Sequence, residues 1–280
     1  MLEEISEASK LYFQGTIEQK QLAANYFMSF TQRPPEDVVP VLFDVVNSDL
    51  DERLISVLLF ACERSILTNS NTFSDGSNVV QEMFNTLLNL LRNRSGNLTN
   101  HAAIIVANLS CHFQHESFFP AVLLQLIDDY ISTQHLSIAI ALKSIVMDIK
   151  IEPDFVNKIF IKFTPLLLGD DFGCEVKNQV ISVLSPISDV AIKVCDSQLI
   201  VQCLQCIIKL INVDELKTSV YHFLSEFPIE SFQNDRQFLA EIITILSNDL
   251  KSVSQIETVP RMIAFVTSII LTFRVNELPN

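Results

Sequence analysis

The sequence predicts an all-α protein, a right-handed α-solenoid (superhelix) made of antiparallel helix pairs. Apolar residues recur at helical spacing along most of the chain, in stretches long enough for helices. The 280 residues include only five glycines, which leaves little of the turn chemistry that a β-sandwich or barrel requires. The helical stretches recur in pairs at intervals of roughly 33 to 43 residues, and such a period is typical of stacked helical repeats.

Residues 2–67 read as two helix pairs laid end to end. The first helix ends at Gly15 and Thr16 caps the second, after which apolar residues continue at helical spacing until Pro34 and Pro35. Residues 38–46 and 54–66 carry the apolar faces of the next two helices, and residues 47–49 form the turn between them. We therefore expect four helices in this stretch.

The rest of the chain repeats this plan. A polar loop at residues 68–77 is rich in turn-forming residues and precedes the third pair. The expected pairs cover residues 79–91 with 102–113, 118–130 with 135–147, 153–167 with 174–184, 200–211 with 215–224, and 238–250 with 259–273. Five prolines are expected to bend or restart helices near their ends: Pro40, Pro120, Pro165, Pro186 and Pro260.

A sequence echo gives the repeat length. Glu175-Val176-Lys177, then Val180 and Leu184, are matched 40 residues further on by Glu215-Leu216-Lys217, then Val220 and Leu224. An acid, an aliphatic residue and a base at the start of the second helix resemble HEAT repeats, whose period is about 40 to 47 residues. We predict about seven such pairs in one solenoid. Neither end is strongly polar, as a capping repeat would be, which is consistent with a fragment of a longer solenoid.

Composition restricts the class of protein and its compartment. With 49% hydrophobic and 19% charged residues, the chain should be folded throughout. No apolar run reaches the roughly 18 residues of a membrane span, so no membrane insertion is expected. The acidic N-terminus lacks the order of a secretory signal, which favours the cytosol or nucleus. The six cysteines are scattered, and a reducing compartment suits them as small core residues without disulfides.

The net charge bears on the kind of partner. A formal charge of -14 disfavours direct binding to the phosphate backbone of nucleic acids and suits basic partners. Acidity is also a common device for solubility, so this alternative stays open.

No set of residues predicts catalysis, and we expect neither an enzyme nor a bound cofactor. The sequence has no glycine-rich phosphate loop, no nucleophile elbow and no zinc-protease motif. Cys203 and Cys206 have redox or zinc spacing, but they lie in an apolar helical run and are interpreted as core residues. Cys111, His112 and His115 could touch a metal, although a surface cluster without a metal is the favoured interpretation because no fourth ligand is evident.

Three segments of the first 115 residues resemble the N-terminal region of importin-β-type karyopherins, most closely the transportin-SR-like branch. They are ASKLYFQGTIEQKQLAANYFMSFTQRP at residues 8–34, LISVLLFACERSI at residues 54–66, and NHAAIIVANLSCHF at residues 100–113. The resemblance lies in helix length and apolar spacing. It divides the chain into an importin-β N-terminal-like region, residues 1–115 with pairs 1–3, and a continuation of the same solenoid, residues 116–280 with pairs 4–7.

This resemblance implies a nuclear transport receptor. Its N-terminal repeats would bind the small GTPase Ran in its GTP form, and other parts would carry protein cargo, including basic cargo, through the nuclear pore. Grooves between adjacent outer helices could take a phenylalanine side chain of nucleoporin segments with Phe-Gly motifs, and the sequence leaves this partner open. The implied location is the cytoplasm and nucleus, and the nuclear envelope with its pores. The alternative is a HEAT scaffold that binds other proteins without any GTPase.

Candidate Ran contacts follow from the inner helices that the resemblance assigns, at residues 17–31, 50–67 and 99–114. On the middle helix a stripe at helical spacing is expected to lie away from the core face, and it consists of Glu52, Ser56, Phe60 and Glu63. The first helix adds Lys20 and Asn25, and the third adds Asn100 and Asn108. A solvated face without a partner is the alternative for each residue. Glu63 departs from the family, where a basic residue is common.

Overall fold

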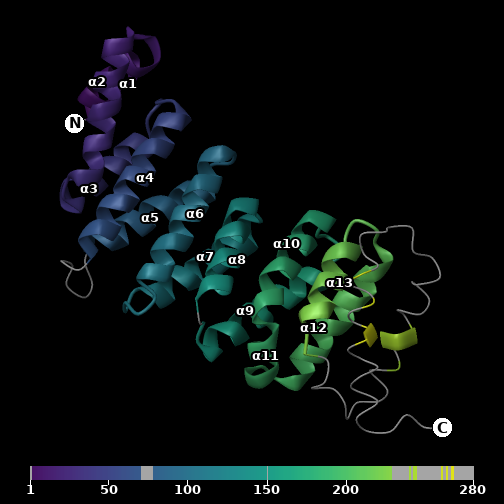
Figure 1. Ribbon diagram of the computed structural model, residues 1–280. Coiled ribbons are helices and arrows are strands. Elements are labelled where there is room, and N and C mark those ends of the chain that lie inside the picture. The colour runs from purple at the N-terminus through teal and green to yellow at the C-terminus, as the bar shows by residue number, and fades with distance from the viewer. Residues whose placement is uncertain are drawn as a thin grey trace. The chain divides into compact units, whose positions relative to one another are not determined.

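The computed structural model describes residues 2–70, 78–149 and 151–228, together with residues 240, 242–244, 260, 263 and 266–267. Across these residues it contains thirteen α-helices, three 3-10 helices and no strand, so the predicted all-α class is confirmed (Figure 1). The chain divides into two compact units, Met1–Ile149 (unit 1) and Lys150–Asn280 (unit 2). The division expected at residue 115 marks the extent of a family resemblance, which this packing does not test.

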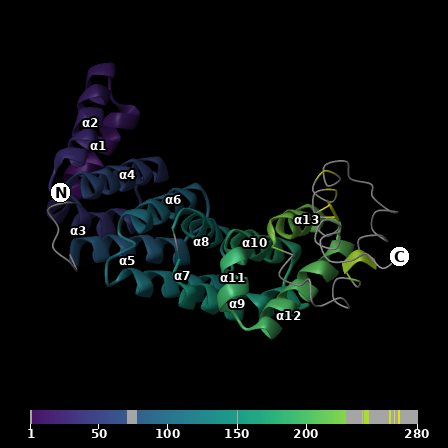
Figure 2. The same ribbon diagram turned by 60° about the horizontal axis from the view of Figure 1, so that its bottom comes forward.

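Unit 1 consists of four helix pairs. In chain order the helices are α1 (Leu2–Gln14), α2 (Ile17–Ser29) with the 3-10 turn η1 (Phe30–Gln32), α3 (Pro35–Val46), α4 (Glu52–Asn69), α5 (Asn78–Asn93), α6 (Asn97–His112), α7 (Phe119–Thr133) and α8 (Leu136–Asp148). Each helix packs on its partner, and α3, α5 and α7 follow one another in one layer while α4, α6 and α8 form a second (Figure 2). The first four pairs are therefore where the sequence predicts them.

Local chemistry fixes the ends of these helices. Thr16 caps α2 in a capping box, in which its hydroxyl accepts from the Gln19 backbone and the Gln19 side chain accepts from the Thr16 N–H at 2.8 Å. Asp51 caps α4 by accepting from the Arg53 N–H at 2.9 Å. Gly96 precedes α6 at a φ of 104°, a conformation that costs glycine little and other residues more. These short junctions keep the helices of each pair antiparallel.

An ion pair joins two neighbouring helices of the α3–α5–α7 layer. Arg92 of α5 meets Asp129 of α7 through two hydrogen bonds, from Nε to Oδ1 at 2.9 Å and from Nη2 to Oδ2 at 2.8 Å. Asp129 is only 5% exposed, and Gln125 donates a third hydrogen bond to its carboxylate. Because the carboxylate has little water around it, its stability depends on these donors.

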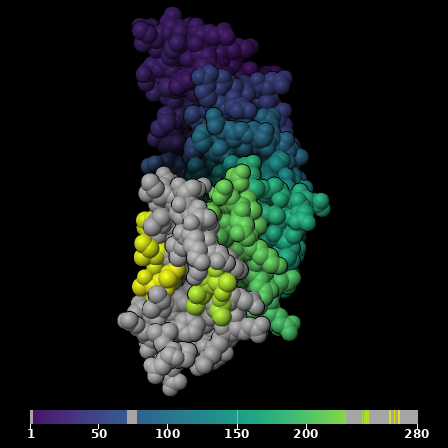
Figure 3. All heavy atoms as spheres, turned by 90° about the vertical axis from the view of Figure 1, so that its right-hand side faces the viewer, coloured from purple at the N-terminus to yellow at the C-terminus, as the bar shows by residue number. Residues whose placement is uncertain are grey.

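Unit 2 continues with helix pairs of the same kind. It contains α9 (Pro153–Leu168), α10 (Cys174–Leu184), η3 (Ser185–Ile187), α11 (Ser188–Val194), α12 (Ser197–Lys209), η4 (Leu210–Asn212) and α13 (Lys217–Glu226). The visible atoms of these helices are closely packed in the space-filling view (Figure 3, green). As predicted, Cys203 and Cys206 are buried core residues of α12.

The sequence echo corresponds to two adjacent helices. α10 packs against α13, and the echoed aliphatic residues Val180, Leu184, Val220 and Leu224 are all fully buried. Two hydrogen bonds join this part of the chain to α13, each between residues 41 positions apart. Ser185, directly after α10, donates to Glu226, and Ser219 of α13 donates to Asn178 of α10. Glu215 does not occupy the same helical position as Glu175, its counterpart in the echo. Glu175 lies in the first turn of α10, whereas Glu215 precedes α13, which begins at Lys217.

The short helix α11 was not predicted. Pro186 has no N–H to donate and therefore interrupts the hydrogen-bond ladder after α10, so the chain passes through η3 and starts again. Residues 188–194 are too few to show a clear helical period, yet Ala191 is buried and α11 packs on α9. The seventh predicted pair, residues 238–250 and 259–273, lies outside the continuous described residues, as does most of the loop at residues 68–77.

Replacing Arg92 by Ala should destabilise unit 1, because it leaves the buried Asp129 carboxylate with Gln125 as its side-chain donor. Breaking a buried pair costs about 3 to 5 kcal/mol, and the partial exposure of Arg92 reduces the expected loss to about 2 kcal/mol. Urea denaturation followed by circular dichroism measures it. Arg64→Ala, an exposed arginine of α4, is the matched control. Equal stability of the two variants would show that the pair contributes nothing.

Candidate protein-binding face

Helix α4 is enclosed on three sides, which decides which of its residues face solvent. It packs on its partner α3, on η1 and α2 before it in the chain, and on α6 of the next pair. A surface helix packed on one side only would expose about half of its circumference. With neighbours on three sides, α4 can expose only a narrow row of side chains.

Ser56 and Glu63 do not belong to that row, and the expectation that they are exposed is wrong. Each is 7% exposed, because both point toward α6. Asn108 Nδ2 donates to Glu63 Oε1 at 2.8 Å, and Ser56 Oγ lies 2.8 Å from Nδ1 of His101. The side of α4 that sequence spacing assigned to a partner is therefore occupied by the neighbouring helix of the same chain.

The hydrogen bonds of Ser56 indicate that Nδ1 is a ring nitrogen of His101 that carries a hydrogen. Ser56 Oγ donates its one proton to the Glu52 carbonyl at 2.9 Å. It can then only accept from His101, so Nδ1 carries a proton. The His101 ring also contacts Phe60, with ring centroids 5.5 Å apart. His101 thus holds α6 against α4 at the middle of the layer, a role that sequence analysis missed.

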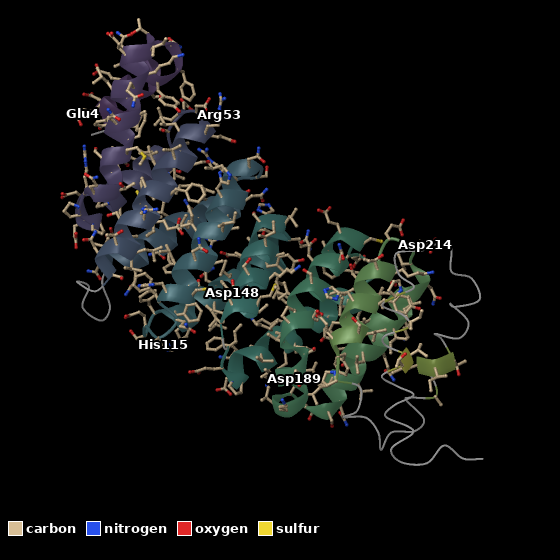
Figure 4. All side chains as sticks on the ribbon, viewed as in Figure 1. Glu4, Arg53, His115, Asp148, Asp189 and Asp214 are labelled. Carbon is tan, nitrogen blue, oxygen red and sulfur yellow. The ribbon has the colours of Figure 1, made fainter. Side chains whose placement is uncertain are left out.

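The exposed row of α4 is displaced by one residue from the predicted stripe. It consists of Arg53, Val57, Phe60 and Arg64, which share one face through spacings of four, three and four residues. Only Phe60, 39% exposed, belongs to both sets. Figure 4 shows Arg53 at the exposed end of α4.

Two further helices carry matching rows. On α6 the row contains His101, Ile104 and Asn108, and on α8 it contains Leu136, Ile140, Lys143 and Met147. Ile104, Leu136 and Met147 are large apolar side chains that remain exposed. Because α4 packs on α6 and α6 on α8, these three rows lie on the same layer of unit 1. We call them the even-helix face.

A cavity adjoins the α4 end of this face. It has a volume of about 300 Å³ and lies between α1, α2 and α4, with Tyr12, Phe27, Met28 and Val57 among its lining side chains. Arg53 borders it, with its guanidinium carbon 5.3 Å from the centre of the Phe13 ring. Such a cavity is large enough for one bulky apolar side chain and offers one cation at its edge.

The other predicted contact residues are accessible to different degrees. Lys20 and Asn25 are exposed on α2, and Glu52 is exposed in the first turn of α4. Asn100 is half-buried, whereas Asn108 is exposed but already donates to Glu63. None of these placements tests binding to a partner.

A second hollow lies between α3 and α5, which are adjacent in the other layer. It has a volume of about 340 Å³ and is lined by Val39, Pro40, Phe43 and residues of α5. This is the kind of groove between adjacent outer helices in which the sequence analysis expected a phenylalanine side chain to bind.

Metal-ligating side chains and cysteines are distributed through the described residues. No group of three metal-ligating side chains comes together among them. All six cysteines are free thiols, and burial raises the pKa of the Cys203 thiol to about 12. None of the helices described is both long and apolar enough to cross a membrane.

No protein-family model matches the chain, and no curated protein matches it.

Glu63→Gln should stabilise the protein at neutral pH. Burial raises the pKa of the Glu63 carboxyl, and the hydrogen bond from Asn108 offsets part of this effect. The folded state therefore holds the proton more tightly than the unfolded chain, so the ionised carboxylate costs stability at pH 7. That cost disappears below the ordinary pKa of 4.5.

The measurement is the thermal midpoint of both proteins between about pH 4 and pH 7, the range that brackets this titration. Glu63→Gln should melt higher at neutral pH, and the difference should shrink on acidification. Glu82→Gln, at an exposed carboxylate of α5, is the control. A difference that stays constant across the range would contradict a buried, ionised Glu63.

Proposed function

We propose that the chain is a HEAT-type α-solenoid, a right-handed superhelix, whose even-helix face in unit 1 binds other proteins. The observation that carries this proposal is the row of exposed apolar side chains that continues from α4 through α6 to α8. On the neighbouring side, α5 and α7 have no exposed large apolar residue among those described, α3 has only Phe43, and α1 has Leu11 and Tyr12. Apolar surface concentrated on one side of a soluble protein is a mark of an interaction site.

The particular function that we propose is that of a nuclear transport receptor. Its N-terminal repeats bind Ran in the GTP form, and other repeats carry protein cargo through the nuclear pore, between cytoplasm and nucleus. Support comes from the resemblance of residues 8–34, 54–66 and 100–113 to the importin-β N-terminal region. Lys20, Asn25, Glu52 and Phe60 are accessible to a partner. The hollow between α3 and α5 would take a nucleoporin phenylalanine.

One observation favours the alternative, a scaffold that binds proteins without a GTPase. Two of the predicted Ran contacts on α4, Ser56 and Glu63, are engaged by His101 and Asn108 within the chain. A partner that needs their polar atoms would have to displace those hydrogen bonds, each of which contributes about 1 kcal/mol. A scaffold needs only the exposed row.

A pull-down with purified Ran separates the two functions. A transport receptor should retain Ran loaded with a non-hydrolysable GTP analogue and not Ran loaded with GDP. Phe60→Ser should weaken that binding about tenfold, because it removes an apolar side chain at the middle of the face. Phe43→Ser, at an exposed phenylalanine of α3, is the matched control and should bind normally. Binding that is absent, or indifferent to the nucleotide, would remove the receptor and leave the scaffold.

A further inference from the structure

Charged residues are distributed unevenly between the two layers of unit 1. Helices α1, α3, α5 and α7 carry nine carboxylates, three each on α1 and α3, one on α5 and two on α7, against the cations Lys10 and Arg92. Helices α2, α4, α6 and α8 carry four of each sign. Glu4 and Arg53 illustrate the difference, one on α1 and the other on α4 (Figure 4). The acidity of the whole chain therefore does not describe the even-helix face.

The rows that form the even-helix face contain cations and no carboxylate. Arg64 and Lys143 are exposed, and neither has an ion-pair partner among the residues that the structure describes. Arg53 is paired with the capping residue Asp51 at 3.0 Å. The exposed carboxylates of α4, α6 and α8 are confined to the ends of the layer, Glu52 as the first residue of α4 and Asp148 as the last of α8.

Glu63 adds no exposed carboxylate to the face. Its side chain is buried, turned toward α6, and accepts a hydrogen bond from Asn108. The three rows that carry Arg64 and Lys143 instead expose the apolar side chains of Phe60, Ile104 and Met147. A partner that covers this surface must bury apolar groups and bring negative charge to the cations.

From this geometry we infer that the even-helix face binds an amphipathic segment of another protein that combines large apolar residues with Asp and Glu. Its apolar side chains would pack on Phe60, Ile104 and Met147, and its carboxylates would pair with Arg64 and Lys143. The cavity beside Val57 would take a bulky apolar side chain at one end. Packed helix axes lie about 8 to 10 Å apart, so a segment crossing from α4 to α8 spans about 20 Å, or about four helical turns.

This inference rests on the part of the proposed function that assigns protein binding to the even-helix face, and it is independent of any GTPase. It also runs against the expectation from net charge alone. A formal charge of -14 for the whole chain suits basic partners, but among the helices of unit 1 the excess of carboxylates over cations lies on α1, α3, α5 and α7. Basic partners would therefore be drawn to that layer, and acidic ones to the even-helix face.

Fluorescence anisotropy with synthetic peptides tests the inference on the full chain. The probe is a labelled peptide of about four helical turns, with Leu and Phe on one face and Glu and Asp on the other. One control peptide replaces every acid by Lys, and a second keeps the composition but scrambles the apolar positions. The acidic amphipathic peptide should bind about tenfold more tightly than either control, and added salt should weaken it.

Charge reversal locates the binding surface. The double variant Arg64→Glu with Lys143→Glu should lose about tenfold in affinity for the acidic peptide and gain affinity for the Lys peptide. Lys158→Glu, at an exposed lysine of α9 in unit 2, makes the same kind of change elsewhere and should leave binding unchanged. Circular dichroism should show that both variants remain folded, because all three substituted side chains are exposed.

Three results would overturn the inference: equal affinity for the acidic and Lys peptides, binding that survives the double charge reversal, or a face that is covered by a second copy of this chain. Sedimentation would reveal the last as a concentration-dependent dimer that the double variant abolishes. Failure with the peptides while Ran still binds in its GTP form would remove this inference alone. Failure of Ran with success of the peptides would remove the receptor alone.

Discussion

The structure of unit 1 depends on the lateral contact between α4 and α6, because this contact sets the rotation of each helix about its axis. Glu63 is held by Asn108, and Ser56 is held by His101. A helix fixed at two points about two turns apart cannot rotate without removing the donor of the buried Glu63 carboxylate and the acceptor of His101 Nδ1. The rotation determines that Val57 and Arg64 face outward. The exposed row of α4 is thus decided in part by Ser56 and Glu63, which are themselves buried.

The same constraint explains the spacing of the repeats. Hydrogen bonds between neighbouring pairs join residues 45 positions apart in the α4–α6 contact, 44 positions apart between Leu91 and His135, and 41 positions apart between α10 and α13. In the α4–α6 and α10–α13 contacts these bonds join the second helices of successive pairs, so their separation is close to the local repeat length. Small differences between repeats are absorbed in the connections, which leaves the aliphatic core positions in register.

Much of this arrangement could be predicted from the sequence. The strong apolar period predicted α1 to α10, α12 and α13 within a few residues, and the echo between Val180 and Val220 predicted that α10 and α13 are equivalent. Helix α11 could not be predicted because it is short and its stability comes from packing on α9. The predicted exposed row of α4 was wrong by one residue. The period of a single helix separates core from surface, but it cannot show which side of the helix a neighbouring helix covers.

Thiol labelling of α4 tests this account most directly. Cysteine is introduced singly at Ser56, Val57, Glu63 and Arg64, and reaction with a maleimide is followed by peptide mass spectrometry. The exposed Cys174 and the buried Cys62 serve as internal references. Cysteines at Val57 and Arg64 should react as fast as Cys174, and those at Ser56 and Glu63 at least about tenfold more slowly, because they react only when the helices separate. Rapid labelling at Ser56 and Glu63 in the folded protein would contradict the packing of α4 on α6.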